Sequence, residues 1–217
     1  MPPVRALPFT LALNSARFLN KFYESSHDGS ILMAHRFLIS HDSPVLYITV
    51  VTKDRIPVFR TDWMRDFLCP ALDEARKSAK ILLFAYAIMW DHMHLLTSRS
   101  STIANVLRVL KGITARRVID HLQEKSHFSS LAKLEHQERN RNHRYSLWQT
   151  ERNVLPVFTE GMFMQKVNYI HQNPVRAGLS ERAEDYRWSS ARIWQGRSLE
   201  NEPLLMDKDL IHWRQRR

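Results

Sequence analysis

Residues 81–97 have the sequence ILLFAYAIMWDHMHLLT, and this stretch decides how the chain folds. Ile81 to Met89 is a nearly unbroken apolar run of strand length, which is typical of a strand in the middle of a sheet. Trp90 and Asp91 suit a tight turn, and Met93 to Thr97 form a further run with strand character. The stretch therefore predicts two strands separated by a tight turn.

The residues before this pair predict a strand and then a helix. Val45 to Val51 is a β-branched and aromatic run of strand length. Apolar residues then recur at spacings of three and four from Trp63 to Ala75, which predicts an amphipathic helix. Asp62 is placed to cap that helix, and Pro70 predicts a kink or a late start.

The residues after the pair predict two more helices and one more strand. Thr102 to Leu122 has helical periodicity, and a last short strand is expected within residues 146–158. Glu160 to Gln172 predicts a third helix, which Asn173-Pro174 should stop. Residues 123–144 are polar and rich in charge, and we expect a loop or a flexible arm there.

The order strand, helix, strand, strand, helix, strand is that of the ferredoxin-like split arrangement. The predicted fold class is therefore α+β, an antiparallel sheet with helices on one face. Because many functions use this fold, the chemistry has to be sought in particular residues.

The composition indicates a folded protein that binds a polyanion. The 217 residues are 44% hydrophobic and 25% charged, as in ordinary globular domains. Lys and Arg total 32 against 22 Asp and Glu, which gives a formal charge of +10. Such an excess points to nucleic acid first and to an anionic membrane surface second, with simple solubility as the alternative.

Several classes of protein are excluded or disfavoured. The single cysteine, Cys69, excludes an internal disulfide framework and a Cys-rich zinc site, and it fits a reducing cytoplasm. The chain has only 5 glycines and no Gly-rich phosphate loop, which disfavours nucleotide-binding folds of that kind. The longest apolar run is about half of what a membrane span needs.

Two histidines lie two residues apart in the second strand of the pair. Alternate side chains of a strand share a face, so His92 and His94 should point one way and Met93 the other, into the core. Two imidazoles at this spacing can bind one divalent ion, although a third ligand must come from elsewhere. The alternative is two polar histidines on a half-exposed strand.

The third predicted helix offers a tyrosine. Phe163, Val167 and Ile170 form a stripe that should pack on the sheet, and Tyr169 and Asn173 share a neighbouring face. A tyrosine held on a packed helix suits a positioned nucleophile, and the alternative is a tyrosine at the rim of the core.

Together the two groups are more specific than either alone. The Asn173 amide oxygen can complete a metal site with His92 and His94, and such a set suits Mg²⁺ or Mn²⁺ weakly. Tyr169 would then lie close to a phosphodiester that the ion polarises. Metal-assisted nucleophilic attack on a nucleic-acid backbone follows as a hypothesis.

Other residues are candidates for DNA contacts. Lys111, Arg116 and Arg117 face one side of the second helix, where phosphate binding and simple solvation are equally reasonable. Trp148 is a candidate for stacking on unpaired bases, with core packing as the alternative, and Arg176 is a further candidate contact.

Several stretches resemble the REP-associated tyrosine transposases, which are IS200-like members of the single-tyrosine HUH transposase superfamily. YAIMWDHMHLL at 86–96 is similar to the HUH motif, two histidines around one hydrophobic residue. YIHQNPVRAGL at 169–179, followed by DYRWSSA at 185–191, is similar to the signature of this family. YITVVTKDRIPVF at 47–59 resembles its first strand.

The resemblance implies a single-strand DNA endonuclease and strand transferase that acts near hairpin-forming palindromic repeats. By the family pattern, His92, His94 and Asn173 match the ligands of Mg²⁺ or Mn²⁺, and Tyr169 matches the nucleophile. The implied product is a 5′-phosphotyrosine link with a free 3′-hydroxyl. The implied partner is single-stranded or hairpin DNA, without a membrane, and the protein is expected as a monomer or a homodimer.

The resemblance also divides the chain. It predicts an N-terminal extension at 1–44, a catalytic domain at 45–179 and a C-terminal extension with a basic tail at 180–217. The extension at 1–44, the basic loop at 125–144 and the stretch NVLPVF at 153–158 depart from the family pattern.

Two other functions stay open at this point. One is a transposase-derived DNA-binding protein that recognises palindromic repeats without cleaving them. The other is a zinc hydrolase of small phosphodiesters, in which a metal-bound water replaces Tyr169 as the nucleophile.

Overall fold

The computed structural model describes residues 37–135 and 144–213. The predicted extension up to residue 36, the arginines at 139 and 141 and the end of the basic tail lie outside the described residues. The elements are β1 (Val45–Val51), α2 (Asp62–Ser78), β2 (Leu83–Ile88), β3 (His92–Thr97), α3 (Ile103–Glu124), α4 (Phe128–Leu134), β4 (Asn153–Val157), α5 (Glu160–Arg176) and α6 (Ala191–Trp194), with short 3-10 turns at 53–55, 183–185 and 208–210.

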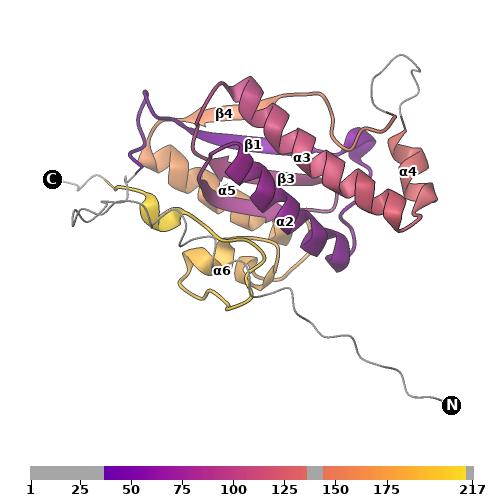
Figure 1. Cartoon of the computed structure of the whole chain (residues 1–217). Helices are drawn as coiled ribbons and strands as arrows, with labels where there is room; N and C mark the ends of the chain where they lie inside the picture. The colour runs from indigo at the N-terminus through magenta and orange to yellow at the C-terminus, as the bar shows by residue number, and fades with distance from the viewer. Residues whose placement is uncertain (1–36, 136–143, 214–217) are drawn as a thin grey trace, which may run out of the picture. The chain divides into compact units, whose positions relative to one another are not determined.

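The strands form one antiparallel sheet in the order β2-β3-β1-β4. Helix α2 connects β1 to β2, and α3 leads, through α4, from β3 to β4 (Figure 1). This confirms the predicted α+β class and its ferredoxin-like order of elements.

The two faces of the sheet bury different sets of side chains. Ile48 and Met93 belong to the core cluster that α2 and α3 share with the sheet. The stripe Phe163, Val167 and Ile170 of α5 packs in a second cluster with other strand residues, as the periodicity predicts. Helices α2 and α3 thus cover one face, and α5 covers the other (Figure 1).

Helix α2 differs from the prediction at its N-cap and at Pro70. Thr61, and not Asp62, caps the helix, because its side chain accepts a hydrogen bond from the Met64 amide. Asp62 is the first helical residue and pairs with Arg65. The helix continues through Pro70, which removes one backbone donor but still fits helical φ.

The predicted stop of α5 at Asn173-Pro174 is wrong. The helix runs on to Arg176, with Pro174 buried in its last turn. Gly178 follows two residues later, and its φ of +68° is the left-handed conformation that glycine adopts without strain. The Leu179 amide then donates to the Pro174 carbonyl and the Gly178 amide to the Val175 carbonyl, which satisfies the last carbonyls of the helix.

The expected loop at 123–144 is partly helical. Helix α3 extends to Glu124, and α4 follows at Phe128–Leu134. Leu131 and Leu134 are both buried there, and two leucines three residues apart place one apolar edge of a short helix on the core.

Residues after α5 cover the outer edge of β2. Ser189 forms a bridge with Ala87, the Tyr186 hydroxyl donates to the Ile88 carbonyl, and the Trp194 indole donates to the Phe84 carbonyl. An edge strand with unpaired backbone groups is a template for aggregation, and this segment occupies it. The boundary at residue 179 stays a prediction.

Candidate active site

The two histidines of β3 lie on the α5 face of the sheet. Their ring centroids are 4.8 Å apart. His92 Nδ1 lies 2.5 Å from Asp91 Oδ1, and the other Asp91 oxygen accepts from Arg55 at 3.1 Å. Partial burial acts to raise the pKa of Asp91, but the hydrogen bonds from His92 and Arg55 outweigh it and keep the pKa below its ordinary value.

His94 is almost fully buried beside two hydroxyl groups of β1. Thr49 stands directly opposite it in the strand register, and its Oγ1 lies 2.9 Å from His94 Nδ1. The Tyr47 hydroxyl lies 3.0 Å from the same nitrogen. Burial, reinforced by the nearby His92, lowers the pKa of His94 to about 3, so the ring is neutral at pH 7.

The hydrogen-bonding pattern of the two rings leaves the same atom available in each. Within residues 37–135 and 144–213, every side-chain hydrogen bond of His92 and His94 goes through Nδ1. A histidine that binds a metal through Nε2 typically has its other nitrogen held by a carboxylate or another acceptor. Asp91 and Thr49 supply such acceptors.

Tyr169 lies beside this pair. Its ring centroid is 5.8 Å from that of His94 and 6.0 Å from that of Tyr47. Burial raises the pKa of Tyr47, and the hydrogen bond from Thr49 acts in the opposite direction. The neighbouring Tyr169 side chain raises this pKa further. Tyr169 itself is 40% exposed, so its side chain is open to a large substrate.

Two cations flank the tyrosine. Lys166 Nζ lies 4.9 Å from the Tyr47 ring centroid and 5.7 Å from that of Tyr169. The Arg176 guanidinium carbon lies 5.2 Å from the Tyr169 ring centroid. Tyr169 and Arg176 also line a shallow cavity of about 260 Å³ on α5. The site is thus open, aromatic and positively charged, which suits a phosphodiester.

Asn173 lies on α5 one turn after Tyr169 and is partly buried. Its Nδ2 donates to the Tyr169 carbonyl at 2.7 Å, so the amide oxygen is the atom left to bind a ligand. The described residues contain no group of three His, Cys, Asp or Glu side chains that could hold a metal ion. A metal at this site would therefore need the two Nε2 atoms together with a neutral oxygen such as that of Asn173, a donor set that suits Mg²⁺ or Mn²⁺ weakly and leaves positions open for other ligands.

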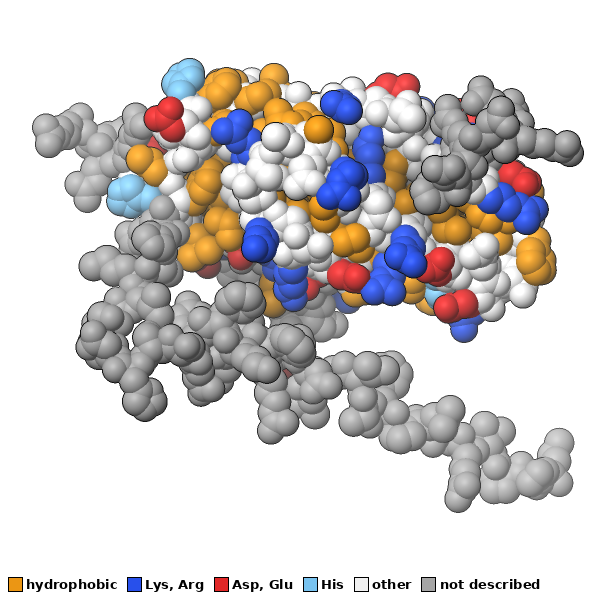
Figure 2. All heavy atoms as spheres, turned by 45° about the horizontal axis from the view of Figure 1, so that its top comes forward, with side chains coloured by type: hydrophobic (Ala, Val, Ile, Leu, Met, Phe, Trp, Pro, Cys, Tyr) orange, Lys and Arg blue, Asp and Glu red, His pale blue; other side chains and the backbone are white. Residues whose placement is uncertain are grey.

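The predicted DNA contacts on α3 lie on the opposite face of the sheet from Tyr169. Lys111 Nζ donates to the Gln149 and Glu151 carbonyls and so ties α3 to the segment before β4. Arg117 makes two hydrogen bonds of 2.8 Å to Glu74 of α2, and Arg116 is exposed on the same helix. Figure 2 shows the basic side chains scattered over the visible face and not gathered in one patch.

The assignment of Trp148 to DNA stacking is corrected by its position. Only 5% of Trp148 is exposed, its indole donates to the Thr114 hydroxyl, and its ring packs beside Phe59. A buried indole with a satisfied N–H is a core residue.

Sequence reasoning missed Tyr47, Thr49 and Lys166. Tyr47 and Thr49 occupy alternate positions of β1, and this alternation was the available signal for a shared face. Their contact with His94 depends on the pairing of β1 with β3, which no local pattern reveals.

Comparisons with known proteins bear on the fold and the family of the chain. The structure of a REP-associated tyrosine transposase bound to a REP hairpin matches with a TM-score of 0.52 at 17% identity, over 76% of this chain and 87% of that chain, which supports the shared fold. A candidate transposase from Deinococcus radiodurans R1 matches at 24% identity over 68% of this chain and 96% of that chain, with a TM-score of 0.40.

Two further findings concern the sequence and its elements. No curated protein matches the chain, and no helix in the described ranges has the length and apolar character to cross a membrane. The model of the family described as "Transposase IS200 like" matches residues 44–173, which is more than half of the 217 residues. The chain belongs to the IS200-like transposase family.

Proposed function

We propose that this transposase is a metal-dependent single-strand DNA endonuclease and strand transferase that acts near hairpin-forming palindromic repeats through a 5′-phosphotyrosine. The observation that carries the proposal is the position of the exposed Tyr169 ring. Its centroid lies 5.8 Å from the centroid of the His94 ring, and the centroids of the His94 and His92 rings are 4.8 Å apart. The similar structure that is bound to a REP hairpin supports DNA of this kind as the substrate.

His92, His94 and Asn173 would hold Mg²⁺ or Mn²⁺, which when bound supplies Lewis-acid polarisation of a phosphate oxygen. Asp91 and the hydroxyls of Tyr47 and Thr49 orient the two imidazoles for this role through Nδ1.

Tyr169 is the proposed nucleophile. Its phenol oxygen forms a bond to the phosphorus while the bond from phosphorus to the 3′ oxygen breaks. The phenol proton passes to water at the open site, and the departing 3′ oxygen takes up a proton to become a hydroxyl. Attack by another 3′-hydroxyl on the phosphotyrosine reverses these steps and joins a new strand.

The experiment uses the full chain and a single-stranded hairpin that is labelled at its 3′ end, since the 3′ fragment becomes attached to the protein. We expect a labelled covalent adduct with Mn²⁺ or Mg²⁺ and none with EDTA. The released fragment should carry a 3′-hydroxyl that a terminal transferase extends. Tight hairpin binding without an adduct under either metal would instead identify a non-catalytic DNA-binding protein.

Removing the Tyr47 and Thr49 hydroxyl groups tests whether they orient the His94 ring for metal binding. Tyr47→Phe and Thr49→Val should each raise the Mn²⁺ concentration for half-maximal adduct formation by roughly tenfold, because the other hydroxyl still forms its hydrogen bond with Nδ1. The double variant should raise it by about a hundredfold. A metal titration of the adduct rate measures this, and an unchanged metal requirement in the double variant would contradict the orienting role.

Arg176 and Arg117 form a matched pair for DNA binding, since each variant removes one positive charge. Arg176→Ala should weaken hairpin binding by roughly fivefold and lower the salt slope by about 0.7, because it lies over Tyr169. Arg117→Ala should change binding by less than about twofold, because Arg117 pairs with Glu74 on the other face. Anisotropy titrations at several salt concentrations give both values, and equal losses would show that DNA also contacts α3.

A further inference from the structure

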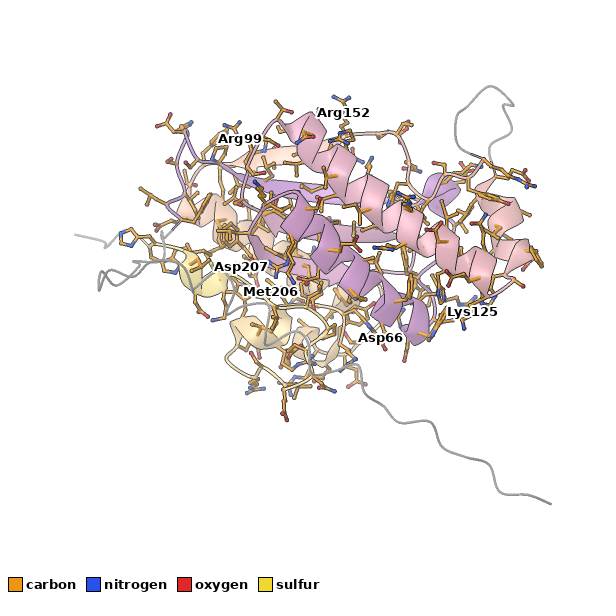
Figure 3. The ribbon with its side chains drawn as sticks, viewed as in Figure 1. Asp66, Arg99, Lys125, Arg152, Met206 and Asp207 are labelled. Carbon is orange, nitrogen blue, oxygen red and sulfur yellow. The ribbon has the colours of Figure 1, made fainter. Side chains whose placement is uncertain are left out.

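A second pocket lies at the end of the sheet where β1 ends and β3 begins. It has a volume of about 590 Å³ and lies between the first turn of α2, the last turn of α3 and α4. We call it the Trp63 pocket, and the residues that matter in it are Arg60, Trp63, Leu122, Lys125, His127 and Lys133. Figure 3 shows Lys125 at the end of α3, away from Arg99 at the opposite end of the molecule.

Trp63 gives this pocket an aromatic surface. The side chain is 46% exposed, although it lies in the first turn of α2 next to the buried Met64. Its ring centroid is 4.5 Å from that of His121 and 6.2 Å from that of His127. An indole that packs on neighbouring rings and keeps nearly half of its surface exposed offers a stacking surface for a planar group.

The charges of the pocket have one sign. Arg60, Lys125 and Lys133 line it, and no Asp or Glu does. Within the described ranges none of these three cations forms an ion pair, whereas Arg117 and Lys77 on the neighbouring helices do. Three unneutralised cations around an exposed indole fit a ligand that is both planar and anionic.

Arg60 connects the pocket to the turn that precedes β3. Its guanidinium lies 5.6 Å from the ring centroid of Trp90, which is also exposed, and the Phe59 amide donates to the Trp90 carbonyl. Trp90 directly precedes Asp91, the residue that holds His92. Arg60 therefore lines the pocket and also contacts the turn that carries Asp91.

We propose that the Trp63 pocket binds an unpaired base of the single-stranded DNA, stacked on Trp63, with its flanking phosphates on Arg60, Lys125 and Lys133. This inference rests on the proposed function, because it assigns a place to a second part of the same substrate. Every base offers a flat aromatic face, so the pocket should accept different bases with similar affinity.

The experiment measures binding by the full chain in EDTA, so that cleavage plays no part. The probe is a hairpin with a single-stranded flank that carries 2-aminopurine at successive positions. One position should be quenched by stacking in the native protein. Trp63→Ala should abolish that quenching and weaken binding by about tenfold, whereas Trp63→Phe should keep most of both.

Charge variants and a blunt hairpin without a flank provide the controls. Lys125→Gln should weaken binding of the flanked hairpin by a few fold, and Arg99→Gln, which removes one charge at the opposite end, should not. Trp63→Ala should leave affinity for the blunt hairpin unchanged, which separates a lost base contact from a damaged fold.

The outcomes distinguish this inference from the proposed function. Unchanged quenching and affinity in Trp63→Ala, with normal adduct formation, would contradict base binding in the pocket but would leave the proposed endonuclease activity supported. A change of oligomeric state without a change in DNA affinity would assign the pocket to a second copy of the chain. Failure of the native protein to bind single-stranded DNA would overturn both.

Discussion

Tyr169→Phe is expected to abolish the covalent adduct and to reduce cleavage of the hairpin by about 10³-fold or more. The substitution removes one oxygen atom and keeps the ring that contacts His94 and Tyr47. Because the side chain is 40% exposed, the loss of its hydroxyl leaves no unpaired group in the core. Hairpin affinity should therefore stay within about twofold of the native value, since Lys166 and Arg176 are retained.

The matched control is Tyr47→Phe, which removes the neighbouring phenol. That variant should still form the adduct, at a raised metal requirement. If Tyr169→Phe cleaves without an adduct, water is the nucleophile and the alternative of a phosphodiester hydrolase gains support. If Tyr47→Phe alone loses the adduct, the two tyrosines have exchanged the roles assigned to them. Denaturing gels with 3′-labelled DNA separate these results.

The sheet could be predicted because its signal is local. The runs at 45–51, 81–89 and 93–97 have lengths and side chains typical of strands, and the two-residue period places Met93 in the core and His94 on the other face. The helix ends could not be placed in the same way. Prolines 70 and 174 each remove a single donor, and packing of the surrounding turns outweighs that loss.

The site was predictable to the extent that its residues share one element. His92 and His94 share a strand, and Tyr169 and Asn173 share a helix, so periodicity alone relates the members of each pair. Thr49 reaches His94 only through the register of β1 with β3, which is a long-range property of the fold.

The DNA contacts assigned to α3 show a second limit of the sequence. A helical pattern separates a polar face from an apolar one but does not reveal which side of the sheet the helix covers. Lys111 and Arg117 were therefore candidates for DNA contacts because of their charge alone. In the structure Lys111 donates to carbonyls near β4, and Arg117 donates to the carboxylate of Glu74.

His92→Ala should abolish cleavage, by about 10³-fold or more, and largely spare DNA binding. His92 is the better of the two histidines to replace, because His94 is buried and its loss would remove one hydrogen-bond partner from each of the hydroxyls of Tyr47 and Thr49. The His92 side chain is 20% exposed, and after its removal Asp91 keeps its ion pair with Arg55. The positive surface that attracts phosphates is thus almost unchanged.

Asp91→Asn provides the graded control, because the amide oxygen still accepts from His92 Nδ1 while the negative charge is lost. We expect it to reduce cleavage by about 10- to 100-fold, between the native protein and His92→Ala. Single-turnover cleavage at saturating DNA and anisotropy titrations on the same samples compare the two quantities directly. If His92→Ala lost binding and cleavage in equal proportion, His92 would serve to hold the DNA, and the division between a cation-lined DNA surface and a metal-binding histidine pair would have to be abandoned.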